Sequence, residues 1–255
     1  MMLRLPSKSY TKNLLSKLLT EVFMKKIALI GDGKVGSKFA ELVREDPAHY
    51  QLSIFNINRP PTKESLQGHD VIMSFVPGAA FQEMIGLLVE VKLPVVVGST
   101  GFTWPENLNH TLIQNKVRWI HASNFSLGMA LIHAMLQILG RAKFLSENLQ
   151  CHIHEIHHIH KKDAPSGTAL AWQKWLNLPA EITSERIGEE IGTHELKMRL
   201  PFEEITVRHQ ALDRKIFAEG ALWAIHQILA NEAIPYGLHH FADLTAQRLT
   251  HPLEK

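Results

Sequence analysis

Proton-carrying and cationic side chains are concentrated in one segment of this 255-residue chain, residues 154–168. Its histidines alternate with isoleucines, as in a half-buried strand, and His157, His158 and Lys161 come at the end of that strand. Histidine titrates near neutral pH, so these side chains can move protons, and the lysine adds a positive charge. The segment therefore predicts a site of general acid–base chemistry.

An anion-binding helix start follows directly. Pro165 suits the first turn of a helix, which would continue over residues 166–172. The backbone N–H groups of Ser166, Gly167 and Thr168 would then lack helical partners and would attract a carboxylate or phosphate. An anionic substrate bound there would lie within reach of the histidines and the lysine.

Two other interpretations of this segment remain open. Histidine-rich tracts can bind metals, and five of the 16 histidines lie between His152 and His160. However, the chain has one cysteine and no His-Glu-x-x-His motif, and the adjacent lysines would repel a cation, so we expect no metal site. The histidines could also belong to a solvated strand, but such a strand does not require a Pro-Ser-Gly-Thr helix start.

A glycine-rich turn near the start of the chain predicts a dinucleotide site. The apolar run 26–30 precedes this turn, and a helical pattern through Phe39 and Val43 follows it. Strand, G-x-G-x-x-G and helix in this order form the dinucleotide fingerprint, whose glycines permit a tight turn, close approach of the pyrophosphate and close helix packing. The expected contact residues are Gly31, Asp32, Gly33, Lys34, Val35 and Gly36.

The choice of cofactor depends on the residues after the second strand. About 20 residues beyond the fingerprint, an acidic residue usually holds the adenosine ribose. This chain has Asn56, Asn58 and Arg59 there instead. Because an arginine accommodates a 2′-phosphate, we expect NADPH, with NADH as the alternative. Arg59 could equally serve only to cap its loop.

The elements that must position these groups alternate along the chain. Apolar strands are expected at 70–75, 94–98 and 117–120, with a helix at 80–93. This rhythm predicts an α/β fold with a Rossmann-type, doubly wound parallel sheet. Ligands of such sheets bind at the carboxyl ends of the strands, which favours two small-residue loops as a cofactor rim over plain turns. Their residues are Gly98, Ser99, Thr100, Ala122, Ser123, Asn124 and Phe125.

The pattern changes after Leu127. We expect a long helix at 128–145, the histidine-rich strand, a short charged connection at 178–191, and strands at 193–200 and 203–210. These elements predict a second, α+β substrate domain with an open mixed sheet. The expected division is an N-terminal extension (1–23), a dinucleotide-binding domain (24–126), a substrate-binding domain (127–213), and a C-terminal segment (214–255) that returns to the dinucleotide-binding domain.

Composition favours a cytoplasmic enzyme with a small-molecule substrate. The apolar content of 45% and the formal net charge of +2 give no indication of nucleic-acid binding or disorder. A single cysteine, Cys151, cannot form an intramolecular disulfide and fits a reducing compartment, and no stretch predicts a membrane span. We interpret residues 1–23 as an overlong reading frame or dispensable arm in preference to a basic targeting segment.

The run from Glu155 to Ala169 resembles the signature of the 4-hydroxy-tetrahydrodipicolinate (dihydrodipicolinate) reductase family, Glu-x-His-His-x-x-Lys-x-Asp-Ala-Pro-Ser-Gly-Thr-Ala. The resemblance extends from about Met24 to the C-terminus. Further segments match in the same order, at 98–102, 124–128, 192–194 and 209–221. Several independent matches in order are stronger evidence than any single motif.

The resemblance implies NAD(P)H-dependent reduction of 4-hydroxy-tetrahydrodipicolinate, with loss of water, to tetrahydrodipicolinate in lysine and diaminopimelate biosynthesis. It implies that His157 is the acid/base group and Lys161 the proton donor. The substrate carboxylates would be held by His158, Ser166, Gly167 and Thr168. The resemblance also implies a homotetramer assembled through the substrate-domain sheet.

The chain also departs from the family pattern. Its phosphate loop reads Gly-Asp-Gly-Lys-Val-Gly where the family has Gly-x-x-Gly-x-Met-Gly, and the connection at 178–191 is short. Another two-domain Rossmann oxidoreductase, such as an amino-acid or sugar dehydrogenase, would fit the fingerprint but does not need the His-His-x-x-Lys and Pro-Ser-Gly-Thr pair. A nucleotide sensor without chemistry would not need an intact His157 and Lys161.

Overall fold

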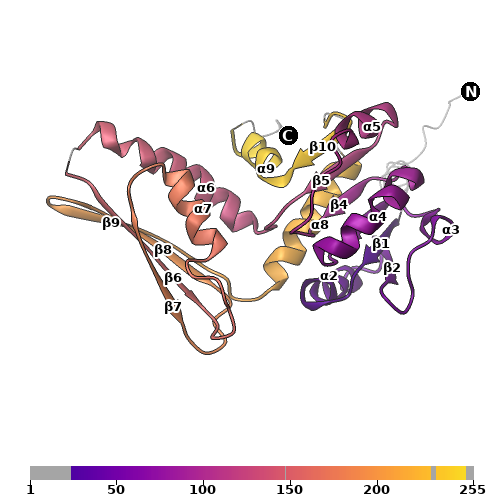
Figure 1. Cartoon of the computed structure of the whole chain (residues 1–255), viewed down its shortest axis with the longest axis horizontal. Coiled ribbons are helices and arrows are strands. Elements are labelled where there is room, and N and C mark those ends of the chain that lie inside the picture. The colour runs from indigo at the N-terminus through magenta and orange to yellow at the C-terminus, as the bar shows by residue number, and fades with distance from the viewer. Residues whose placement is uncertain (1–23, 147, 231–233, 251–255) are drawn as a thin grey trace, which may run out of the picture.

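The computed structural model describes residues 24–146, 148–230 and 234–250. The interpretation of residues 1–23 concerns residues outside these ranges. The described chain forms two lobes, one built on a six-stranded sheet and the other on a four-stranded sheet (Figure 1). No helix of the described ranges combines the length and apolar character that a membrane span requires.

The first lobe is a parallel sheet with the strand order β10-β5-β4-β3-β1-β2. Its strands are β1 (Lys25–Ile30), β2 (Tyr50–Phe55), β3 (Val71–Ser74), β4 (Val95–Val97), β5 (Arg118–His121) and β10 (Gly237–His240). Its helices are α2 (Lys34–Arg44), α3 (Lys63–Leu66), α4 (Gly78–Val91), α5 (Leu108–Gln114), α8 (Lys215–Ala230) and α9 (Phe241–Thr250).

Both faces of this sheet are buried. Along β1, Ile27 and Leu29 pack with helices α2 and α8, whereas Ala28 and Ile30 pack on the opposite face with α4 and α5. Burial on both faces explains why the strands read as continuous apolar runs. The prediction of a doubly wound parallel sheet is confirmed.

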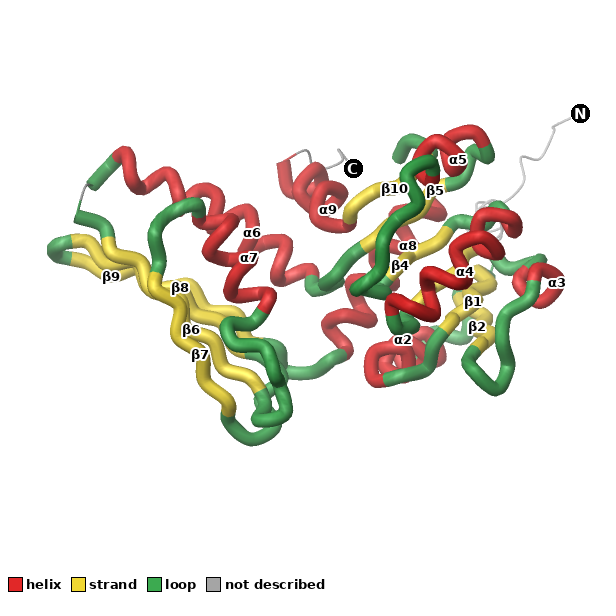
Figure 2. The backbone as a smooth tube through the Cα atoms, viewed as in Figure 1, coloured by secondary structure: helices red, strands yellow, loops and turns green. Residues whose placement is uncertain are grey.

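The second lobe has the strand order β7-β6-β8-β9, with β6 and β7 parallel and the other pairs antiparallel. Its strands are β6 (Gln150–His157), β7 (Glu181–Arg186), β8 (Thr193–Leu200) and β9 (Glu203–Gln210), and its helices are α6 (Leu127–Leu139), the 3₁₀ helix η1 (Gly140–Phe144) and α7 (Gly167–Leu176). Helices α6 and α7 lie over one face of the sheet and leave the other uncovered (Figure 2). Trp172 and Leu136 pack there against Ile153 and Leu196. The predicted second domain with an open mixed sheet is confirmed as a fold class.

Three expectations about the elements need correction. The helix expected at 128–145 is α-helical only to Leu139 and continues as the 3₁₀ helix η1. At Gly140 a Cβ would lie 2.0 Å from the carbonyl oxygen of Leu176, so the glycine lets the end of α7 approach. The connection at 178–191 is not a plain loop, since it contains the edge strand β7. Strand β10, which extends the first sheet beside β5, was not expected because its four residues are too few to show a pattern.

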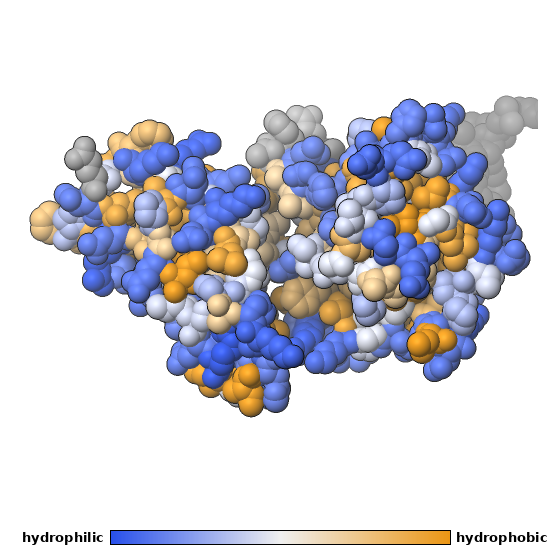
Figure 3. Space-filling view, viewed as in Figure 1, coloured by the Kyte–Doolittle hydropathy of each residue, from blue (hydrophilic) through white to orange (hydrophobic). Residues whose placement is uncertain are grey.

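The carboxyl ends of the first lobe's strands face the second lobe across a hollow that is visible between the two (Figure 3). A cavity of about 360 Å³ lies there. Its lining includes Ser123 and Asn124 after β5, His133 and Trp175 from the second lobe, and Asp243 from α9. The fold therefore places the loops after β5 beside residues of the second lobe.

Candidate active site

Each of the three glycines in the turn between β1 and α2 has a different structural role. Gly31 has φ +95°, and a Cβ on it would lie 2.9 Å from the carbonyl oxygen of Phe75. Gly33 caps the start of α2, and nothing lies within 4 Å of the position its Cβ would take. A Cβ on Gly36 would lie 2.0 Å from the carbonyl oxygen of Gly31. Tight turn, open approach and close helix packing are the geometry that dinucleotide binding requires.

Asp32 lies in this turn, beside the loop after β2 that carries Asn56 and Arg59. The Asn56 amide donates a hydrogen bond to the Asp32 carboxylate at 2.8 Å. The Arg59 backbone N–H donates to Asn56, while its guanidinium lies 5.1 Å from the centroid of the Phe55 ring. No carboxylate of the described ranges pairs with this guanidinium. Arg59 thus closes its loop through its backbone and keeps an exposed charge.

The two small-residue loops of the expected cofactor rim lie side by side, because β4 and β5 are parallel neighbours with Val97 opposite His121. A Cβ on Gly98 would lie 2.5 Å from the Phe75 ring and 3.2 Å from the Phe125 ring, so the glycine lets both rings approach. Ser99 is buried, and its hydroxyl has no hydrogen-bond partner among the described residues. A buried hydroxyl without a partner is suited to binding a ligand.

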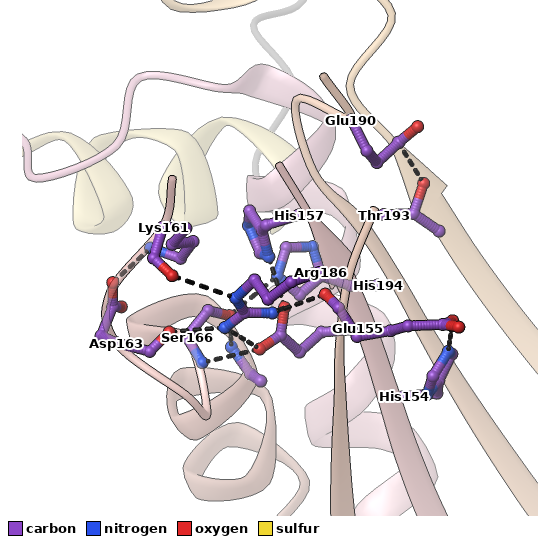
Figure 4. Close-up of polar contacts among 12 residues, drawn as sticks. His154, Glu155, His157, Lys161, Asp163, Ser166, Arg186, Glu190, Thr193 and His194 are labelled. Atoms are coloured by element: carbon purple, nitrogen blue, oxygen red, sulfur yellow. Dashed lines mark hydrogen bonds and ion pairs between the residues drawn. The ribbon is translucent and has the colours of Figure 1, made fainter. Parts of the chain in front are cut away.

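His157 ends strand β6 and is 8% exposed. Its Nδ1 is hydrogen-bonded to the Glu155 carboxylate (Figure 4). Burial lowers the pKa of His157 below its ordinary value, and the hydrogen bond and charge of Glu155 only partly oppose this shift. A histidine ring held by a carboxylate in this way is suited to proton transfer.

Glu155 is fully buried and contacts three elements. Arg186 of β7 donates to both of its oxygens, with Nη1–Oε2 at 3.0 Å and Nη2–Oε1 at 2.9 Å, and the backbone N–H of Ser166 donates to Oε1 at 3.0 Å. Burial by itself would raise the pKa of Glu155, but hydrogen bonds from Arg186, His157 and Ser184 outweigh it and bring the pKa to about 2. The carboxylate is ionised at neutral pH.

No role was predicted for Glu155 or Arg186 from the sequence. A signal for the pair was present, because a carboxylate in a strand that is buried on one face requires a cation. The alternation of Ile182, Ser184 and Arg186 with Glu181, Thr183 and Glu185 could have identified β7 as the strand that supplies it.

The start of α7 differs from the expected anion cradle. Pro165 precedes the helix, and Ser166 caps it, with its Oγ accepting the N–H of Ala169 at 3.1 Å. The prediction that the Ser166 N–H is free is wrong, since Glu155 accepts it. Gly167 and Thr168 are the residues whose N–H groups remain outside the helical hydrogen bonds.

Lys161 lies in the loop between β6 and α7. Its Nζ is paired with Asp163 Oδ1 at 2.8 Å. Nearby, His158 is half-buried, and its Nδ1 has no hydrogen-bond partner among the described residues. The exposed His160 lies outside this cluster, with Nε2 4.0 Å from Glu189. The structure therefore brings His157, Lys161 and the start of α7 together, but not all the histidines of the run.

His194 of β8 is a further buried member of the cluster. Its Nε2 lies 3.2 Å from Ser166 Oγ, and its ring centroid is 5.1 Å from that of His157. Burial, together with the neighbouring His157, lowers the pKa of His194 to about 3, so its ring is neutral. Residues 192–194 match the family pattern, but no role was predicted for His194, because only the pairing of β6 with β8 brings it to His157.

Within residues 24–146, 148–230 and 234–250, no three His, Cys, Asp or Glu side chains are grouped so that they could hold a metal ion.

The chain is similar to curated proteins over most of its length. A 4-hydroxy-tetrahydrodipicolinate reductase of Thermosipho africanus is 33% identical over 175 residues, covering 69% of this chain and 78% of the relative. A protein of the same name from Xanthomonas campestris pv. campestris is 29% identical over 229 residues, covering 83% and 93%.

Among solved structures, the dipicolinate-bound dihydrodipicolinate reductase from Paenisporosarcina sp. TG-14 matches with a TM-score of 0.69 and 21% identity, covering 86% of this chain and 98% of that one. At this identity the match speaks for the fold. Family models described as dihydrodipicolinate reductase, N-terminus, and dihydrodipicolinate reductase, C-terminus, match residues 25–125 and 128–242. The chain therefore belongs to the dihydrodipicolinate reductase family.

Proposed function

We propose that this protein reduces 4-hydroxy-tetrahydrodipicolinate to tetrahydrodipicolinate in lysine and diaminopimelate biosynthesis. Family membership supports the reaction. The structural observation that carries it is that His157, the backbone of Lys161 and the start of α7 all contact one buried ion pair, Glu155–Arg186. In the overall balance, one NAD(P)H and one proton are consumed and one water is released.

His157 is proposed as the acid/base group and Lys161 as the proton donor. The substrate carboxylates bind at the start of α7, through the N–H groups of Gly167 and Thr168, with His158 and Ser166 beside them. A cyclic dicarboxylate needs such anion sites for orientation, so that a proton can be delivered to the ring carbon as the enamine formed on reduction collapses. Lys161 also offsets the negative charge of the substrate.

NAD(P)H, when bound, supplies the hydride that reduces the ring. Its pyrophosphate fits the open side of Gly33 at the start of α2, and the buried Ser99 hydroxyl offers an unused polar contact at the rim. The proposed binding residues are Gly31, Asp32, Gly33, Lys34, Val35, Gly36, Arg59, Gly98, Ser99, Thr100, Ala122, Ser123, Asn124 and Phe125. The exposed Arg59 guanidinium favours NADPH over NADH.

The proposed division of the chain assigns residues 24–126 and 214–255 to the dinucleotide-binding domain and 127–213 to the substrate domain. Ala221 and Ile225 of α8 share a core with Ile27 and Phe39, which supports this division. The uncovered face of the second sheet supports self-association, and we propose a homotetramer in the cytoplasm.

The test is cofactor oxidation by the purified protein, with NADPH and NADH separately, on substrate generated in situ by the preceding synthase. Substrate-dependent oxidation is expected with NADPH. The exposed His160 supplies a matched control, because His160→Gln should retain the activity of the unmodified protein. Binding of NADPH without its consumption would contradict the proposal and favour a nucleotide sensor. Reduction of NADP⁺ or NAD⁺ by amino acids or sugars, without oxidation of NADPH on the proposed substrate, would favour another dehydrogenase.

A further inference from the structure

We propose that Glu155 and Arg186 are positioning residues for this reaction: the carboxylate fixes the ring of His157, and the guanidinium fixes the loop that carries Lys161. The inference rests on the proposed function, because it assigns a task to groups that do not touch the substrate. It concerns the residues that hold the proton-handling side chains, His157 and Lys161, in position.

Glu155 determines which nitrogen of His157 carries the proton. An ionised carboxylate only accepts hydrogen bonds, so His157 Nδ1 must donate to it. In a neutral imidazole the lone pair is then on Nε2. This nitrogen is on the side of Gly192, where a Cβ would lie 3.0 Å from it. The contact therefore leaves Nε2 as the nitrogen that can exchange a proton with a substrate.

The same carboxylate also sets the position of the anion cradle. Its Oε1 accepts the backbone N–H of Ser166, the residue that caps α7. A shift of Glu155 would therefore move both the proton carrier at the end of β6 and the first turn of α7. One buried group thus links the general acid/base to the site of the substrate carboxylate.

Arg186 holds the other proton-handling group. In addition to its two bonds to Glu155, its guanidinium donates to three backbone carbonyls: those of Lys161 at 3.3 Å, Glu185 at 2.7 Å and Asp163 (Figure 4). Two of these carbonyls belong to the loop between β6 and α7. The planar fork of arginine suits this arrangement, whereas a lysine offers a single point charge.

The charge of Glu155 acts directly on His157. The groups that face the imidazole are Glu155 on its own strand, Arg186 on β7, His194 on β8 and Lys161 in the loop. Burial and the two cations lower the pKa of His157, and Glu155 is the group that raises it. Replacing this carboxylate by an amide should therefore move the pKa of His157 further down.

Glu155→Gln tests the carboxylate. We expect kcat to fall by about 10²-fold, as when a histidine loses the carboxylate that sets its tautomer. The limb of the pH–rate profile that reports His157 should move to lower pH, while NADPH binding is unchanged. Glu181→Gln makes the same exchange at an exposed position of β7 and should leave both kcat and the profile unaltered.

Arg186→Lys tests the guanidinium. It keeps the positive charge near Glu155 but loses the paired hydrogen bonds and the contacts to the loop, so kcat should fall by about tenfold. Here the main effect should be on the step that uses Lys161, and the limb that reports His157 should move less than in Glu155→Gln.

The outcomes separate the two levels of the proposal. If the unmodified protein does not reduce the substrate, the proposed function fails. If it does, and Glu155→Gln keeps kcat and the pH profile, the positioning inference fails while the function stands. Should Glu155→Gln not fold, nitrogen NMR of His157 in the unmodified protein decides the matter. A proton on Nδ1 is expected, and a proton on Nε2 with Nδ1 bare would overturn the inference.

Discussion

Lys161 Nζ lies 2.8 Å from Asp163 Oδ1, two residues further along the same loop. The hydrogen bond from Lys161 holds the pKa of Asp163 below its usual range, and the backbone N–H of Gly167 adds to this effect. Asp163 therefore contacts both Lys161 and the Gly167 N–H, which are proposed to bind the substrate. A substrate carboxylate must displace Asp163 or share these two groups with it.

Asp163→Asn is the first prediction. Without the competing charge, substrate should bind more readily, and KM should fall by about two- to fivefold, the range expected for an exposed ion pair. Steady-state kinetics measures this directly. Glu189→Gln, at an exposed position beyond β7, should leave KM unchanged. A higher KM in Asp163→Asn would mean that Asp163 organises the loop and does not compete with substrate.

The glycines of the phosphate turn predict two different defects. Gly33→Ala has room for its Cβ in the folded chain, so the melting temperature should hold within about 2 °C, while NADPH affinity falls by about tenfold or more. Gly36→Ala places a Cβ 2.0 Å from the Gly31 carbonyl oxygen and should lose about 3 kcal/mol or more of stability. Cofactor titration and thermal melting of both variants separate the two roles. Wild-type affinity in Gly33→Ala would argue against a pyrophosphate at this turn.

Arg59→Gln addresses cofactor choice. If the guanidinium binds the 2′-phosphate, the Kd for NADPH should rise by about tenfold, while the Kd for NADH stays the same. Arg44→Gln, at the opposite end of α2, serves as the control for a general loss of positive charge. Equal affinities of Arg59→Gln and the unmodified protein for NADPH would leave Arg59 only its structural role in the loop.

Stability should fall on the acid side of neutrality because of His194. Its folded pKa of about 3 is below the ordinary value of 6.5, so the unfolded chain binds the proton first as the pH falls. Between pH 6.5 and about 4.5 this costs about 2–3 kcal/mol. His194→Asn should therefore show a smaller loss over this interval in urea unfolding, whereas the exposed His110→Asn should match the unmodified protein.

Other buried histidines should account for the pH dependence of stability that remains in His194→Asn. Burial lowers the pKa of His121, His209 and His226 as well, so His194→Asn should reduce the pH dependence without removing it. Glu155 contributes only at lower pH, because its folded pKa of about 2 is below an ordinary value of 4.5. An unchanged slope in His194→Asn would show that His194 is not buried as a neutral ring.

The predictions that succeeded rest on patterns within a few neighbouring residues of the sequence. The turn at Gly31, Gly33 and Gly36 and the apolar strands depend on backbone geometry and burial within a few residues, which periodicity reveals. The partners of Glu155 could not be found in this way. Arg186 is 31 positions away, on a partly polar edge strand, and Ser166 contributes a backbone N–H that has no sequence signal. Strand β10 is a strand because it pairs with β5, and its own four residues show no strand pattern.

The proposed role of His157 in hydride-dependent reduction of the dicarboxylate ring is tested most directly by transfer of a label from the cofactor. With NADPH that carries deuterium at the transferring position, the unmodified protein should deliver one deuterium to the tetrahydrodipicolinate product, as measured by mass spectrometry. His157→Gln should deliver it about 10²-fold more slowly or worse, with NADPH binding nearly unchanged. Deuterium that stays on the cofactor in the unmodified protein, or normal transfer by His157→Gln, would contradict the account.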